Sequence, residues 1–194
     1  MGLRIVIVQG HPDCRRPHLC HMLARAYAEG AGAAGHSVEV VEPARLDFPL
    51  LSSPAEWRHG TLPPQLAAVQ EAIRLADHVV LLYPLWLGDM PAMLKGFLEQ
   101  VARPGFAVVP SGRLSGDGLP RGRTGRVVVS TPMTAPVYRW VHGAHSLKLV
   151  RRSIFRPAGI KPMRATVVGS AGELSEAQIE GWRRRLRRLG ERAR

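Results

Sequence analysis

The residues with the clearest chemical potential lie in two short segments, each of which follows an apolar run. The first segment, 9–20, reads QGHPDCRRPHLC and mixes imidazoles, arginines and thiols. A loop that leads into a helix offers free backbone N–H groups and a favourable helix dipole, both of which attract phosphate. The segment therefore predicts a phosphate site near His11 and His18, although it contains neither G-x-G-x-x-G nor a Walker A motif. His11 alone is equally well explained as a capping or turn residue.

The same segment permits a second interpretation, as a zinc site. Its soft nitrogen and sulfur ligands are His11, Cys14, His18, Cys20 and His21. No C-x-x-C pair is present, and half of these residues are expected to enter a helix facing different ways. We therefore expect no metal site.

The second segment follows the most hydrophobic run of the chain, 78–83. It consists of Pro84, Leu85, Trp86, Leu87 and Gly88. An extended run of this kind presents backbone amides and an aromatic ring at the end of a strand. A flat, amphipathic ring system needs such a site, because its faces require apolar walls and its polar edge requires peptide donors. The alternative is that Trp86 and Met90 only pack over the edge of the sheet.

The elements that must position these segments alternate between apolar, β-branched runs and helical patterns. Strands are predicted at 4–9, 37–41, 78–83, 126–131 and 165–169, and helices at 18–34, 65–76, 91–102 and from Ser175 onward. The intervening stretches 43–64 and 104–124 are predicted to be irregular. Five strands, each followed by a crossover, give a doubly wound parallel α/β sheet in one domain, 1–194. Ligands of such sheets bind at the carboxyl ends of the strands, which places the search at 9–20, 84–91 and 130–145.

Composition narrows the setting of this 194-residue chain. No apolar run approaches the roughly 18–20 residues of a membrane span, and the run 5–8 is too short for a signal peptide. Two cysteines without an export signal favour the reducing cytoplasm.

Charge is distributed unevenly along the chain. Residues 1–100 hold 8 Lys/Arg and 10 Asp/Glu, whereas 101–194 hold 19 and 5, for net charges of −2 and +14. A basic half attracts anions such as nucleic acid, anionic lipid or phosphate-bearing cofactors, but it is also what a solvated, arginine-rich surface looks like. Nucleic-acid binding is not expected, because Trp182 is the only aromatic near the arginine run 183–194 and its helical spacing assigns it to the core.

Three phrases carry a resemblance to a known family: IVIVQGHPD at 5–13, ADHVVLLYPLWLGDMPAMLKGFLEQV at 76–101 and GFA at 105–107. They resemble the flavodoxin-fold NAD(P)H:quinone reductases, which include the DT-diaphorase type, the modulator-of-drug-activity reductases and the ancillary subunits of potassium-efflux systems. The resemblance extends from about residue 4 to 170. It implies a flavodoxin-like sheet in the order 2-1-3-4-5 with helices on both faces, bound FAD or FMN, NAD(P)H as co-substrate, and a quinone acceptor. It also implies a homodimer and, from the potassium-efflux branch, contact with a membrane transporter.

The resemblance assigns roles to individual residues. The flavin phosphate region would be held by His11, His18, Leu19 and Cys20. The isoalloxazine would be lined by Pro84, Leu85, Trp86, Leu87 and Gly88, and its pyrimidine edge would be contacted by Ser130, Thr131, Pro132 and Met133. The nicotinamide and substrate would lie under Tyr138 with His142 or His145.

Two departures from the family pattern leave alternatives open. His18-Leu19-Cys20 stands where the family has a Ser-Phe-Asn-like triplet, and Pro132 lies in a loop that is usually rich in glycine. Proline has no N–H, so a backbone donor to the flavin would be missing there. A flavin-binding regulatory subunit with little turnover is therefore the alternative to an enzyme. Tyr138 is equally consistent with a core aromatic whose hydroxyl reaches the surface.

Overall fold

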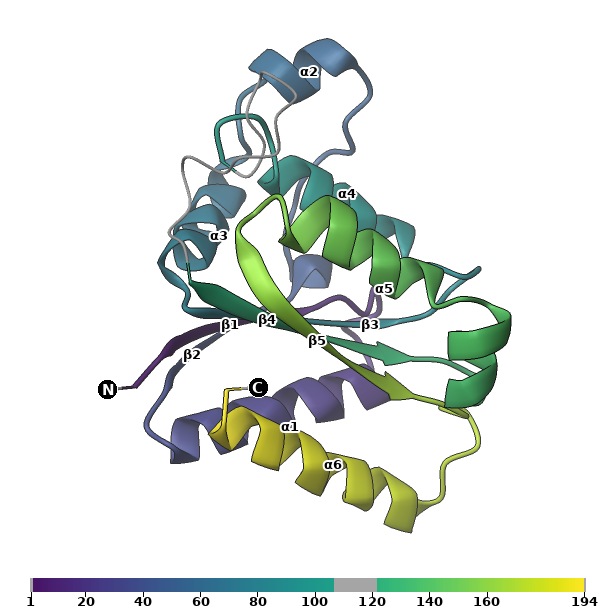
Figure 1. Ribbon diagram of the computed structural model, residues 1–194. Helices are drawn as coiled ribbons and strands as arrows, with labels where there is room; N and C mark the ends of the chain where they lie inside the picture. Colours follow the sequence, from purple (N-terminus) through teal and green to yellow (C-terminus); the bar gives the residue numbers. More distant parts are fainter. Residues whose placement is uncertain (1, 107–121, 194) are drawn as a thin grey trace.

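The computed structural model describes residues 2–106 and 122–193 and contains a five-stranded, fully parallel sheet (Figure 1). The strands are β1 (Arg4–Gln9), β2 (Ser37–Val41), β3 (His78–Pro84), β4 (Arg123–Ser130) and β5 (Ile160–Val168). Their order is β2-β1-β3-β4-β5, and every neighbouring pair is parallel. The predicted flavodoxin-like architecture and strand order are confirmed.

Helices cover both faces of the sheet. One face carries α1 (Leu19–Ala33) and α6 (Glu176–Glu191), and the other carries α3 (Pro64–Leu75), α4 (Ala92–Val101) and α5 (His145–Leu149), which continues as the wider turns of η3 (Val150–Phe155). Alternate residues of β1 show why both layers are needed. Ile5 and Ile7 pack toward α1 and α6, whereas Val6 and Val8 join the core under α3 and α4. A strand buried on both faces must be apolar throughout, which is the pattern that the sequence shows.

The layer of α1 and α6 is held together by close backbone contact. A Cβ at Gly30 would overlap the carbonyl oxygen of Arg187, and a Cβ at Gly190 would overlap that of Tyr27. Only glycine allows two helices to approach so closely. The start of α6, predicted at Ser175, is fixed by Ser175 and Gln178, whose side chains each accept a hydrogen bond from the other's backbone N–H in a capping box.

Several element boundaries differ from the prediction. β4 begins at Arg123 and β5 at Ile160, three and five residues earlier than expected. Both early portions contain charged residues or proline and so lack the apolar run that marks a buried strand. In β5 this portion lies at the open edge of the sheet, where exposed Lys161 and Pro162 are tolerated.

Two stretches contain more structure than expected. The irregular stretch 43–64 includes η1 (Pro43–Arg45) and α2 (Pro54–His59), which Ser53 caps through the N–H of Glu56. The segment after β4 forms η2 (Val137–Val141) before α5. Most of the predicted excursion 104–124 lies outside the described residues. Within the described ranges, no helix is long and apolar enough to cross a membrane.

Candidate functional site

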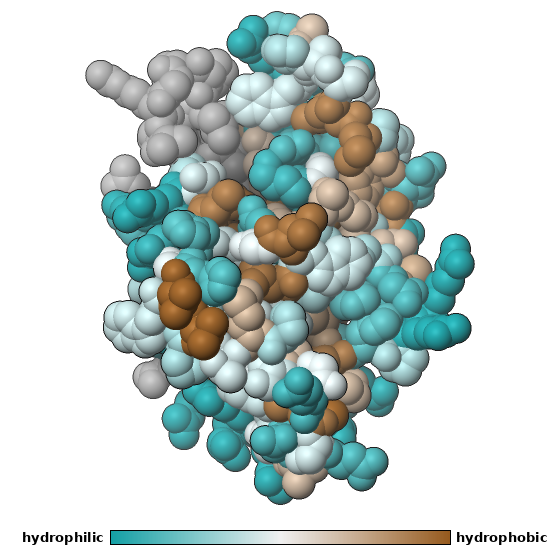
Figure 2. Space-filling model, turned by 90° about the vertical axis from the view of Figure 1, so that its right-hand side faces the viewer, coloured by the Kyte–Doolittle hydropathy of each residue, from teal (hydrophilic) through white to brown (hydrophobic). Residues whose placement is uncertain are grey.

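The carboxyl ends of β1, β3 and β4 bring the predicted loops together at one rim of the sheet. Gln9 pairs with Leu82, and Pro84 pairs with Ser130, so these three strands end side by side. The rings of His11 and Trp86 meet edge to face with centroids 6.1 Å apart, which joins the first loop to the second. Figure 2 looks onto this rim and shows separate hydrophobic groups among polar ones.

The first loop gathers three imidazoles at the start of α1. His11 and His18 stack with ring centroids 3.9 Å apart, and His21 lies 5.4 Å from His11. Asp13 orients the group: its carboxylate accepts a hydrogen bond from His18 Nε2 at 2.8 Å, and its N–H donates to His11 Nδ1 at 3.1 Å. The N–H of His18 donates in turn to His21 Nδ1 at 3.1 Å, which closes the first turn of the helix. Sequence reasoning placed His11 and His18 here but missed Asp13 and His21 as the groups that orient them.

The protonation of this cluster follows from its burial. Burial lowers the pKa of His11 below its usual 6.5, and the His18 and His21 imidazoles lower it further. Burial likewise lowers the pKa of His21. The hydrogen bond from His18 lowers the pKa of the Asp13 carboxyl. At neutral pH, His11 and His21 are therefore uncharged, and because each accepts at Nδ1, each keeps an N–H donor at Nε2.

The second loop is a tight turn that projects from the sheet. Trp86 N–H donates to the Asp89 carbonyl at 2.8 Å, and Asp89 N–H donates back to the Trp86 carbonyl at 3.1 Å. The two central residues, Leu87 and Gly88, have φ of 49° and 86°, which is the pattern of a type I′ turn. A left-handed conformation is normal for glycine but costs about 1 kcal/mol for leucine.

The exposure of this turn is as unusual as its backbone. The Leu87 side chain is fully exposed, and Trp86 is 49% exposed, although both are large and apolar. Among the described residues, the N–H groups of Leu87 and Gly88 have no acceptor. The turn thus offers apolar surface and two open backbone donors side by side. Pro84 and Leu85 behave differently: both are buried, and they support the turn from below.

The third predicted segment offers no comparable amides. Thr131 N–H donates to the Val168 carbonyl at 2.9 Å, and Met133 N–H donates to Thr131 Oγ1 at 3.2 Å. Pro132 has no N–H, so all three positions are closed as backbone donors. Pro132 is exposed and Met133 half-buried, so these residues supply apolar surface at the rim. The sequence predicted one missing backbone donor, at Pro132, and the N–H groups of Thr131 and Met133 are also already occupied.

Cys20 and Ser130 lie beneath the rim and face each other. The Cys20 thiol and the Ser130 hydroxyl are 3.3 Å apart, and both side chains are buried. Burial raises the pKa of the Cys20 thiol to about 11, so the thiol stays protonated and unreactive at neutral pH. Cys20 can therefore serve a bound anion only through its backbone N–H, as can half-buried Leu19 at the first position of α1.

Tyr138 is placed in the core rather than over the rim. Its side chain is 1% exposed, and its hydroxyl is 3.0 Å from Ser146 Oγ, which is itself 2.8 Å from the Tyr83 hydroxyl. The interpretation of Tyr138 as a core aromatic is therefore correct for the ring but wrong for the hydroxyl, which is buried with Ser146 instead of reaching the surface. The network ties the segment after β4 to the end of β3. Ser146, its central member, gave no signal in the sequence.

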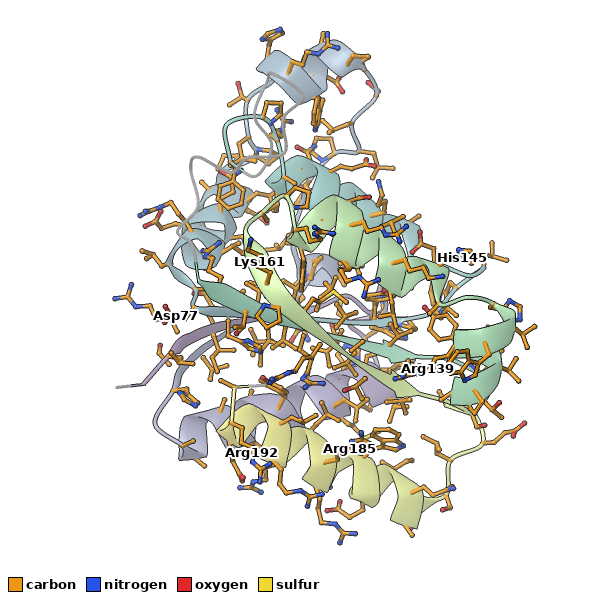
Figure 3. The ribbon with its side chains drawn as sticks, in the orientation of Figure 1. Asp77, Arg139, His145, Lys161, Arg185 and Arg192 are labelled. Carbon is orange, nitrogen blue, oxygen red and sulfur yellow. The ribbon has the colours of Figure 1, made fainter. Side chains whose placement is uncertain are left out.

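The two other residues predicted for substrate contact are on the surface. His142 and His145 are exposed, and His145 begins α5 at the right-hand end of the view in Figure 3, the end toward which the strands point. No contact joins either imidazole to His11 or Trp86 within the part of the chain that the structure describes. Their assignment to the substrate site stays a prediction.

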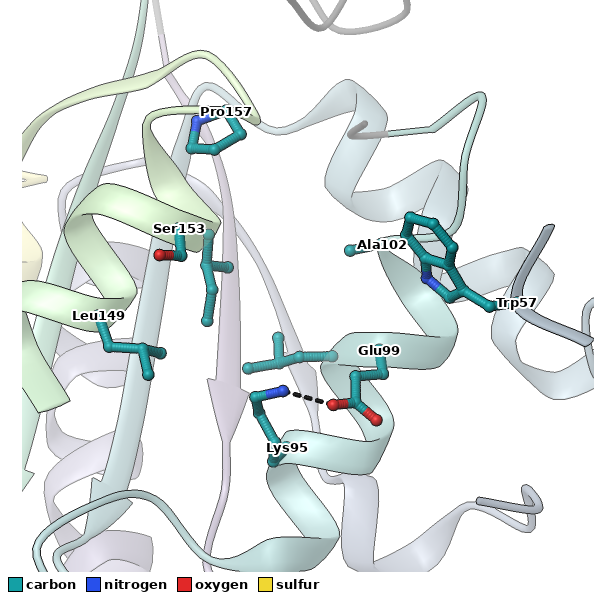
Figure 4. A pocket seen from close by; sticks show the side chains of 9 residues that line it. Trp57, Lys95, Glu99, Ala102, Leu149, Ser153 and Pro157 are labelled. Carbon is teal, nitrogen blue, oxygen red and sulfur yellow. Dashed lines mark hydrogen bonds and ion pairs between the residues drawn. The ribbon is translucent and has the colours of Figure 1, made fainter. Parts of the chain in front are cut away.

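Two further observations limit the alternatives. No group of three or more His, Cys, Asp or Glu in 2–106 and 122–193 is arranged to hold a metal ion. A separate hollow of about 310 Å³ lies between α4 and η3, where Leu98 and Leu149 form walls and Lys95 pairs with Glu99 (Figure 4). It takes no residue from the three loops of the rim.

The fold and this rim define a class of protein. A family model described as the flavodoxin-like fold matches residues 3–189, and the chain belongs to that family. Membership accounts for the sheet order β2-β1-β3-β4-β5.

Relatives sharpen the class. The chain is 29% identical over 152 residues to NAD(P)H dehydrogenase [quinone] 1 of Rattus norvegicus, covering 74% of this chain and 55% of the relative. It thus spans about half the length of the curated relatives it matches. A solved NAD(P)H:quinone oxidoreductase from Methanothermobacter marburgensis superposes with a TM-score of 0.77 at 25% identity, covering 98% of this chain and 96% of that one.

A third protein is similar in fold alone. An FMN-dependent NADH-azoreductase from Bacillus anthracis, solved in complex with FMN, superposes with a TM-score of 0.74 at 14% identity over 99% of both chains. The resemblance to the quinone reductases drawn from the sequence is confirmed by these matches.

Proposed function

We propose that the chain is a flavin-dependent oxidoreductase that passes a hydride from NAD(P)H to a quinone or similar acceptor. The observation that carries the proposal is the turn 86–89, where a leucine is held exposed and left-handed beside two open amides. Strain of this kind persists where surrounding structure enforces it, and it is concentrated at ligand sites. The named activities of the relatives supply the reaction class.

The residues present are suited to a flavin, FAD or FMN. Trp86 and Leu87 offer apolar surface for a flat ring, and the N–H groups of Leu87 and Gly88 offer donors for its polar edge. The amides at the start of α1, together with the Nε2–H of His11, suit the phosphate. A flavin bound there would supply reversible hydride chemistry, which the amino-acid side chains of the rim cannot provide.

The protein's part in this chemistry would be positioning and charge stabilisation. The turn amides would donate to negative charge on the ring, and they are already oriented before it arrives, so no reorganisation is needed. Because 131–133 offer no amide, the turn would carry more of this stabilisation than the segment after β4. Tyr138 and Ser146 would act as positioning residues that anchor that segment to β3, while Met133 and Pro132 would border the ring.

The proposal is tested by following NAD(P)H oxidation with a soluble quinone in the presence of added flavin. Trp86→Ala should weaken flavin binding about tenfold or more, because it removes the aromatic wall and loosens the turn. Trp57→Ala is the matched control: Trp57 lies in the hollow beside α4, so flavin binding should be unchanged. A protein that binds neither FMN nor FAD would contradict the proposal.

Tight flavin binding with negligible quinone reduction would instead favour a regulatory subunit of a cation-efflux system. The specific observation behind that alternative is the lack of free amides at 131–133. A homodimer and contact with a membrane transporter remain predictions from the family resemblance, and a cytoplasmic location remains a prediction from the two cysteines and the lack of an export signal. Sedimentation of the flavin-loaded protein measures its mass in solution and so tests the predicted homodimer.

A further inference from the structure

A second hollow of about 580 Å³ lies at the opposite edge of the sheet from β2. It is bounded by η2, α5 and η3 on one side and by β5 on the other. Leu147 and Met163 form part of its wall, and its rim carries Arg139, Trp140, Lys148 and Arg151. Figure 3 shows Arg139 where η2 comes close to the distal half of β5. Arg139, Trp140 and Ala144 belong to the third predicted segment, 130–145, but none of the residues that line the hollow belongs to 9–20 or 84–91.

The cations of this hollow pair with no carboxylate in 2–106 and 122–193. Residues 118–172 contain no Asp or Glu at all. Some exposed arginines elsewhere in the structure pair with nearby carboxylates, as Arg183 does with Glu180. Among the described residues, by contrast, Arg139, Lys148 and Arg151 form no ion pair. Three unneutralised cations around one concave site create a positive potential that attracts a multiply charged anion.

The local helix places these groups together. Lys148 of α5 and Arg151 of η3 line the hollow together with small Ala144, which precedes α5. Trp140, in η2 before the chain turns at Gly143 and Ala144, is 84% exposed. The apolar surface of this indole stays in contact with water, and covering it would be favourable.

The combination of indole and cations selects a ligand chemistry. An indole face stacks on a flat heterocycle, and arginine and lysine bind phosphate oxygens through charge-assisted hydrogen bonds. Phosphate alone would leave Trp140 unused. A nucleic-acid strand would need successive aromatic platforms along a groove, whereas this hollow has one. Its volume lies in the range of small-molecule sites.

We propose that this hollow binds a nucleoside phosphate of about the size of ADP, with the base stacked on Trp140 and the phosphates held by Arg139, Lys148 and Arg151. The site takes no residue from the first two rim loops or from 130–133, and the proposal does not rest on the proposed function. Binding there would place a nucleotide against α5 and η2, the segment that the Tyr138–Ser146–Tyr83 network ties to the rim.

The test is calorimetric titration of the whole protein with ADP at low and moderate salt. We expect saturable one-site binding that weakens with salt. Arg151→Gln should weaken it tenfold or more, because a charge-assisted bond to phosphate is lost. Arg152→Gln is the matched control, since Arg152 is equally exposed and adjacent in sequence but does not line the hollow, and it should bind ADP as the parent does.

Two further arms separate the parts of the proposal. Trp140→Leu should weaken ADP binding but leave pyrophosphate binding unchanged, whereas Trp86→Ala should change neither. The proposal is overturned if the parent shows no saturable ADP binding, or if Arg151→Gln and Arg152→Gln behave alike. It is also overturned if pyrophosphate binds as tightly as ADP, or if a single-stranded oligonucleotide binds more tightly than ADP and loses that binding with Arg151→Gln.

Discussion

Leu87 shows at the scale of one residue how this rim departs from what stability alone would choose. Its side chain contributes no packing, and its backbone occupies a region that glycine fills at no steric cost. Leu87→Gly should therefore leave the free energy of unfolding unchanged or raise it by up to ~1 kcal/mol, since relief of strain offsets the greater freedom of the unfolded chain. Urea unfolding measures this change.

The same substitution should weaken flavin binding, because it removes apolar surface from the turn. Leu85→Ala provides the contrast: Leu85 is 6% exposed, and its truncation should cost about 2–4 kcal/mol of stability. A Leu87→Gly protein that is destabilised by more than 1 kcal/mol would show that Leu87 stabilises the fold. That result would contradict the proposal that its backbone strain serves ligand binding.

At the scale of elements, the contact between α1 and α6 depends on glycine at two positions. Gly30→Ala should destabilise the protein by about 1–3 kcal/mol or more, because its Cβ would overlap the carbonyl oxygen of Arg187 and force the helices apart. Gly32→Ala, in the same helix, meets no atom within 4 Å and should stabilise by ~0.5–1 kcal/mol through helix propensity. Thermal unfolding of the two variants measures these changes in stability. Equal changes for Gly30→Ala and Gly32→Ala would contradict the close contact between α1 and α6.

The sequence predicted elements well wherever one local signal dominated. β1 and β2 were predicted at their observed bounds, because each is a short β-branched run with clear limits. The rim loops followed from topology, since parallel strands end on one edge. The stacking of His11 on His18 could not be predicted, because it depends on how a turn folds back at Asp13. The buried hydrogen bond of the Tyr138 hydroxyl could not be predicted either, because it depends on a hydroxyl of Ser146 that has no periodic signature.

At the scale of the whole molecule, His78 makes stability depend on pH. It is 1% exposed, with its ring nitrogens 2.9 Å from the Tyr27 hydroxyl and 2.7 Å from Thr124 Oγ1. Burial, together with the charges of Arg126, Arg164 and His36, lowers the pKa of His78 from 6.5 to about 4. Between pH 6.5 and 4, His78 is therefore protonated in the unfolded chain but not in the native state. The free energy of unfolding falls as the pH drops below 6.5, and the loss is complete near pH 4, at a total of ~3 kcal/mol.

Urea unfolding at pH values between 6.5 and 4 measures this dependence. His78→Gln should be less stable than the parent at neutral pH. Its free energy of unfolding should fall less steeply on acidification, because unfolding takes up as much as one proton fewer than in the parent. Exposed His59 is the control, and His59→Gln should keep the slope of the parent. If His78→Gln and the parent have parallel pH profiles, His78 does not resist protonation in the native state.

The rim at the ends of β1, β3 and β4 joins these scales, since a strained residue, a helix start and the sheet order all converge on it. The most direct test is to mix the purified protein with excess FMN or FAD, desalt it, and record the visible absorption spectrum. The account predicts about one flavin retained per chain, with its absorption bands shifted from those of free flavin, and much less retained by Trp86→Ala than by Trp57→Ala. Colourless parent protein with either flavin, or equal retention by the two variants, would contradict it.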